Sequence, residues 1–69
     1  MKRYCIQIYY SKDNVKINEF IVEAEGPISA LEILTKNTNF PINLSNILTL
    51  NAALNEFEKQ GLIVSIFRI

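Results

Sequence analysis

The chain has no histidine and a single cysteine, Cys5, and these two shortages exclude most of the chemistry that a small protein can carry. One cysteine cannot form an internal disulfide. Without histidine, a zinc site would need almost pure carboxylate ligation, which is rare. A catalytic cysteine needs a neighbouring base or a cationic pocket to ionise its thiol. We therefore expect no metal, no cofactor and an inert, buried Cys5.

Glycine is scarce as well. Gly26 and Gly61 are the only glycines, so the chain lacks the glycine-rich loop that cradles the phosphates of a nucleotide. The sequence also offers no pair of nucleophile and base. These absences predict that the protein is not an enzyme.

Net charge is absent too, because seven Lys and Arg residues balance seven Asp and Glu residues. A neutral chain has no electrostatic footprint for nucleic acid, and its weak self-repulsion favours association.

No apolar run approaches the ~18 residues of a membrane-spanning helix, and polar residues soon follow Met1, so we expect no membrane span and no signal peptide. The unpaired cysteine indicates a reducing cytoplasm. The frequent Ile, Asn and Lys residues are typical of A/T-rich codons, and hence of a low-GC bacterium or its phage.

With 69 residues, of which 49% are hydrophobic, the chain is predicted to form one globular domain over residues 1–69. A domain of this size buries only ~60% of the surface that its unfolded chain exposes, so its stability alone is marginal. Small domains add disulfides, metals or oligomerisation. Since the first two are excluded, we expect a homo-oligomer or a complex with a larger partner.

Alternating apolar residues predict three strands, at Lys2–Tyr10, Val15–Ala24 and Leu62–Ile69. The first two are expected to form an antiparallel hairpin around a turn at residues 11–14. The apolar phase changes within the second strand. Either a bulge near Asn18-Glu19 brings five apolar residues to one face, namely Val15, Ile17, Phe20, Val22 and Ala24. Or Ile21 shares a face with Val15 and Ile17, opposite Phe20 and Val22.

Two helices are predicted between the second and third strands. The first begins at Gly26-Pro27, because proline suits the first helical position, and it ends near Asn37, before an extended step at Phe40-Pro41. The second runs over Ala52–Gln60, with Asn51 as N-cap and Gly61 as the stop signal. The segment Ile42–Leu50 could be a short edge strand or the first turns of the second helix.

The predicted order is β-β-α-(β)-α-β, which indicates an α+β fold with a single small antiparallel or mixed sheet and two helices packed on one face. The helices are expected to cover the face that carries Tyr4, Ile6, Ile8, Leu62, Val64 and Ile66. The other face would then carry Cys5, Gln7, Tyr9, Ile63, Ser65, Phe67 and Ile69.

Four large side chains on that second face, Tyr9, Ile63, Phe67 and Ile69, predict a dimer interface or a platform for a protein partner, because clustered exposed apolar groups mark contact sites. Two other interpretations remain open: the loop from Asn37 to Ser45 folds over this face, or the helices cover it instead. Arg3 and Arg68 form a candidate anion-binding pair, since two arginines can grip a phosphate.

The sequence therefore predicts a small non-catalytic binding protein of the cytoplasm. We expect a regulator or inhibitor, an accessory protein of a bacterium or phage, that forms a homodimer or larger homo-oligomer and occludes a protein partner. One alternative is an oligomer that binds a nucleotide or another small anionic ligand through Arg3 and Arg68. A second is a nucleic-acid-binding module, against which the charge balance speaks.

Overall fold

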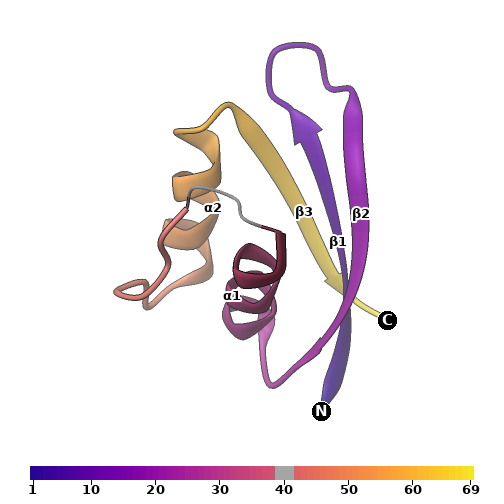
Figure 1. The fold of residues 1–69 in the computed structure, drawn as a ribbon, viewed down its shortest axis with the longest axis vertical. Helices are drawn as coiled ribbons and strands as arrows, with labels where there is room; N and C mark the ends of the chain where they lie inside the picture. Colours follow the sequence, from indigo (N-terminus) through magenta and orange to yellow (C-terminus); the bar gives the residue numbers. More distant parts are fainter. Residues whose placement is uncertain (39–41) are drawn as a thin grey trace.

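The computed structural model describes residues 1–38 and 42–69, which contain three strands and two helices in the order β-β-α-α-β. This order confirms the predicted α+β class (Figure 1). The elements are β1 (Lys2–Tyr10), β2 (Lys16–Ala24), α1 (Pro27–Thr38), α2 (Leu50–Glu58) and β3 (Leu62–Arg68).

The sheet has the strand order β2-β1-β3, and β1 runs antiparallel to both of its neighbours. The β1–β2 hairpin closes through hydrogen bonds from the Tyr10 N–H to the Val15 carbonyl (3.0 Å) and from the Asn14 N–H to the Tyr10 carbonyl (2.9 Å). Asn14 has a φ of 58°, in the left-handed region that asparagine tolerates. The predicted hairpin and the turn at residues 11–14 are thus confirmed.

The bulge in β2 lies closer to the hairpin than predicted. Ile8 pairs with Asn18 and Tyr9 pairs with Lys16, so Ile17 is the extra residue. From Asn18 to Ala24 the pairing is regular, which excludes the bulge expected near Asn18-Glu19. The register places Ile21 on one face and Phe20 and Val22 on the other, as in the alternative interpretation.

The second helix begins earlier than predicted, because Thr49 and not Asn51 caps it. Thr49 has extended backbone angles, and its Oγ1 accepts a hydrogen bond of 3.2 Å from the Ala52 N–H. Threonine thereby satisfies one of the amides that a helix start leaves unpaired. At the other end, Gly61 has a φ of 77° and follows the helix as the predicted stop signal.

The described residues of the Ile42–Leu50 segment form neither a strand nor early helical turns, and α2 begins only at Leu50. The Asn43 Oδ1 accepts a hydrogen bond from the Ser45 N–H at 2.9 Å, and this local bond competes with a regular backbone pattern. Leu44 is buried in the core and holds the segment there. The extended step predicted at Phe40-Pro41 lies outside the described residues.

Both helices lie on the same side of the sheet and form a second layer over it (Figure 1). The core between the layers is one cluster of buried side chains, with partly buried Val64 and Ile66 of β3 packed against it. Ile6 and Ile8 of β1 are fully buried there, which confirms the predicted helix-covered face. The main members of the core cluster are Tyr4, Ile6, Ile8, Ala30, Leu31, Leu34, Leu44, Ala53, Phe57 and Leu62.

No helix in the described ranges has the length and apolar content that a membrane crossing requires.

Candidate interaction surface

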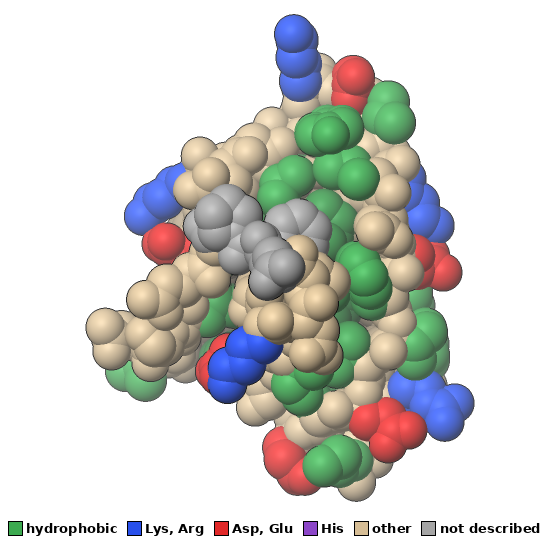
Figure 2. All heavy atoms as spheres, viewed as in Figure 1, with side chains coloured by type: hydrophobic (Ala, Val, Ile, Leu, Met, Phe, Trp, Pro, Cys, Tyr) green, Lys and Arg blue, Asp and Glu red, His purple; other side chains and the backbone are tan. Residues whose placement is uncertain are grey.

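The side of the sheet that faces away from both helices is here called the open face. The strand register orders its residues in rows across β2, β1 and β3, and Ile69 continues the pattern because its N–H donates to the Arg3 carbonyl at 3.0 Å. Hydrophobic side chains alternate with charges of both signs along the sheet margin that Figure 2 shows. The rows are Glu23–Arg3–Ile69, Ile21–Cys5–Phe67, Glu19–Gln7–Ser65 and Lys16–Tyr9–Ile63.

Large apolar side chains on the open face are exposed to solvent. The exposed fractions are 55% for Ile21, 38% for Ile63, 44% for Phe67 and 58% for Ile69, and Tyr9 is half-buried. Tyr9, Ile63, Phe67 and Ile69, the four residues predicted from the sequence, therefore lie together on one side of the sheet.

The described part of the loop from Asn37 to Ser45 does not cover the open face. Leu44 is a member of the core cluster, and Ile42 packs against that cluster on the helix side of the sheet. Residues 39–41 lie outside the described residues. The faces are also not reversed, because the helices pack over Ile6 and Ile8. Within the described ranges, the exposed side chains are thus left to contact solvent or another molecule.

Cys5 is buried although it lies on the open face, with only 5% of its surface exposed. Its neighbours in register are Ile21 on β2 and Phe67 on β3. Because the thiol is short and both neighbours are large, we attribute its burial to these two side chains. Cys5 is thus the buried thiol that the sequence predicted, and it forms the floor of an apolar row across the sheet.

A polar network crosses the open face one row further along. The Glu19 Oε1 accepts hydrogen bonds from the Lys16 Nζ (2.7 Å) and the Gln7 Nε2 (2.8 Å), and the Tyr9 hydroxyl donates to the Gln7 Oε1 (3.1 Å). The bond from Lys16, followed by that from Gln7, lowers the pKa of Glu19, and the bond to Glu19 raises the pKa of Lys16. Since Arg3 also pairs with Glu23 at 3.9 Å, the charges of this face are matched.

Ile21 is the main residue of the open face that the sequence prediction omitted from the interface. It is more exposed than Phe67 and lies on the opposite side of Cys5. The sequence pattern that could have placed Ile21 on this face is the alternation of Glu19, Ile21 and Glu23 with Phe20 and Val22. That alternation could be interpreted only once the position of the bulge was known.

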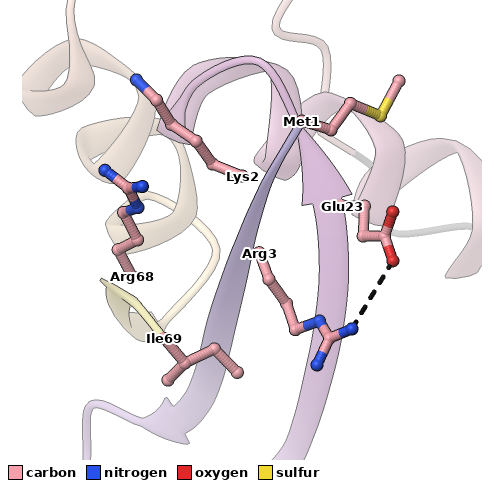
Figure 3. Close-up of a pocket in the computed structure, with 6 residues that line it drawn as sticks. All are labelled: Met1, Lys2, Arg3, Glu23, Arg68 and Ile69. Carbon is pink, nitrogen blue, oxygen red and sulfur yellow. Dashed lines mark ion pairs between the residues drawn. The ribbon is translucent and has the colours of Figure 1, made fainter.

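The candidate anion-binding pair is divided between the two faces of the sheet. Arg3 pairs with Glu23 in the register, whereas Arg68 lies opposite Tyr4 and therefore on the helix side. In Figure 3, Arg68 points to the same side as Lys2, and Arg3 points away from them toward Glu23. All of them line a hollow of about 380 Å³ at this end of the sheet. The structure does not bring the two guanidinium groups onto one face.

The described residues hold no group of three or more His, Cys, Asp and Glu side chains that could bind a metal ion. Comparison with protein-family models, with curated proteins and with solved structures gave no match for this chain. The arrangement of the sheet and its open face is therefore the basis for the proposed function.

Proposed function

We propose that this protein is a small non-catalytic binding protein that associates with itself and occludes a protein partner through the open face. The observation that supports this function is the row Ile21–Cys5–Phe67 with its neighbours Ile63 and Ile69, an apolar surface that no described segment of the chain covers. Contiguous apolar surface of this kind marks protein contact sites.

The balanced charges on the open face fit such a role better than the alternatives. Arg3 and Lys16 are each paired with a glutamate, so the face offers no excess of positive charge to a phosphate backbone. The divergence of Arg3 and Arg68 argues against one small anion held between them. Aromatic and aliphatic anchors with a polar rim are instead typical of protein interfaces.

A regulator or inhibitor acts by this mechanism when a preformed surface covers the working surface of its target. A few large side chains supply most of the binding energy in such contacts, and Phe67 is the aromatic residue best placed for that role on the open face. We assign the protein to the accessory proteins of a bacterium or phage, acting in the cytoplasm, on the composition of its sequence.

The function is tested by the substitution Phe67→Glu, with Leu48→Glu as its matched control. Leu48 is 90% exposed and lies in the segment before α2, away from the open face. We expect light scattering to show an oligomer for the wild type and for Leu48→Glu. Phe67→Glu should give a subunit of about 7.9 kDa with unchanged circular dichroism, because a charge would replace the apolar anchor of the contact.

Two results would overturn the proposal. The first is a wild-type chain that remains monomeric at every concentration. The second is unfolding of Phe67→Glu while Leu48→Glu stays folded, since Phe67 would then belong to the core of the subunit and not to its contact surface.

A further inference from the structure

The two edges of the sheet differ in their protection against pairing with another strand. The edge strand β2 carries a bulge at Ile17 and the charged residues Lys16, Glu19 and Glu23. Bulges and charges are the features that keep an edge strand from pairing with another chain. The other edge strand, β3, pairs regularly with β1 over its full length and has only Ser65 and Arg68 as polar residues. The β3 edge is therefore the one that is open to pairing.

The hydrogen bonds at the two ends of β3 identify which backbone groups are available. The Ser11 N–H donates to the Gly61 carbonyl, and the Ile69 N–H donates to the Arg3 carbonyl, so odd-numbered residues of β3 point their backbone groups toward β1. By alternation, Leu62, Val64, Ile66 and Arg68 direct their N–H and C=O groups outward. Within residues 1–38 and 42–69, the sheet adds no strand beyond β3.

We propose that β3 pairs antiparallel with β3 of a second copy of this chain, about a two-fold axis at Ser65, to form a six-stranded sheet. This proposal rests on the proposed function and specifies its self-association. In this register Leu62 pairs with the partner copy's Arg68 position and Val64 with its Ile66 position. All four outward-facing residues of each strand then form ladder hydrogen bonds, whereas any shift leaves some of them unpaired.

The side chains of β3 fit the same register. Ser65 meets its own symmetry mate at a non-hydrogen-bonded position, where the Cα atoms of two strands approach to about 4.5 Å. A serine is small enough for that approach. Phe67 lies opposite Ile63 of the second copy on the open face, and aromatic residues facing β-branched residues stabilise antiparallel pairs. The strand is thus complementary to itself in both backbone and side chains.

The size of the open face supports a second copy as the occupant of this edge. Strand spacings of about 4.8 Å and rises of about 3.3 Å per residue give one three-stranded face a planar area of about 400 Å². A stable protein interface buries about 800 Å² on each partner. A two-fold axis perpendicular to the sheet leaves both open faces on the same side. The pair therefore presents a continuous surface of about the size that the occlusion of a partner requires.

A cysteine placed at the two-fold axis tests the register. In a Cys5→Ala background, Ser65→Cys should form a disulfide-linked dimer under mild oxidation, because a Cα separation of about 4.5 Å falls within the range of disulfides. Ile63→Cys alone should not, since its symmetry mate would lie about 13 Å away along the strand. A mixture of Ile63→Cys and Phe67→Cys should again yield a covalent dimer.

Amide hydrogen exchange tests the same pairing in the wild-type chain. The amides of Val64 and Ile66 should be protected in the oligomer and exchange rapidly in the Phe67→Glu subunit, while the Ser65 amide stays protected in both. A wild-type dimer that shows no cross-link through Ser65→Cys and no protection of Val64 and Ile66 would overturn the β3 pairing and leave the proposed function intact. A wild-type monomer would overturn both.

Discussion

The burial of Cys5 illustrates how single residues shape the open face. Neither of the two described helices covers this side of the sheet, yet the thiol is 5% exposed, because Ile21 and Phe67 flank it in the register. Burial on this side thus comes from neighbouring strands and not from a second layer. Phe67 has two roles at this position, since it shields Cys5 within the subunit and offers its own exposed surface to another molecule.

Gly61 carries a conformational requirement that can be tested at one residue. It connects α2 to β3 with a φ of 77°, and a Cβ atom at this position would meet only the Ser11 Oγ at 4.0 Å. Space is therefore available, and backbone conformation alone should decide the outcome. We expect Gly61→Ala to lower the free energy of unfolding by about 1–2 kcal/mol, the cost of the left-handed conformation for an L-residue.

Gly61→Asn serves as the control, because asparagine tolerates the left-handed region better than alanine does. Urea denaturation should show that it retains more stability than Gly61→Ala. Equal loss in the two variants would mean that contacts, and not backbone angles, determine the effect.

At the scale of elements, the start of α2 separates two interpretations of the same sequence. Thr49 and Asn51 are both residue types that cap helices, but only Thr49 accepts a hydrogen bond from the helix start, at 3.2 Å. We expect Thr49→Ala to lower the free energy of unfolding by about 1 kcal/mol. Asn51→Ala should leave it unchanged or raise it slightly, because alanine is the better helix former inside the first turn. A larger loss from Asn51→Ala in thermal or urea denaturation would contradict the observed cap.

The strands and helices could be predicted from the sequence wherever one strong periodic signal was present. The alternation in β1 and β3 and the glycine and proline signals around α1 located these elements to within one residue. The bulge in β2 could not be located, because Ile17, Phe20 and Ile21 allow two phases and only the pairing with β1 selects one. In the Ile42–Leu50 segment the apolar residues fit the period of a strand as well as that of a helix. The structure shows an irregular segment instead, with Leu44 buried in the core.

The candidate site was predicted to a similar extent. Alternation along single strands was sufficient to place Tyr9, Ile63, Phe67 and Ile69 on one side of the sheet. The association of Arg3 with Arg68 overlooked the same alternation, which puts Arg3 on the open face and Arg68, opposite Tyr4, on the other face. A one-residue change of register moves every side chain of a strand to the other face, so Ile21 could be assigned to the open face only once the bulge at Ile17 was located.

At the scale of the whole molecule, the number of layers determines which side of the sheet is exposed. Two helices form one layer on one side of the sheet, and within the described ranges the chain has no further helix or strand for the other side (Figure 1). The apolar side chains on the open face and the unprotected β3 edge are consequences of that arrangement. We infer that self-association and partner binding both use the β3 half of the sheet, where the apolar residues are concentrated.

Hydroxyl-radical footprinting of two phenylalanines tests whether Phe67 is exposed in the subunit and lies at the contact between two copies. Phe57 is buried between the layers, whereas Phe67 is 44% exposed on the open face. We expect Phe67 to be oxidised in dilute solution and to become less reactive as the protein concentration rises, because Ile63 of a second copy then lies beside it, while Phe57 remains protected throughout. A Phe67 that is as unreactive as Phe57 in the dilute monomer, or that is equally reactive at every concentration, would contradict the claim that Phe67 is exposed in the subunit and lies at the contact between two copies.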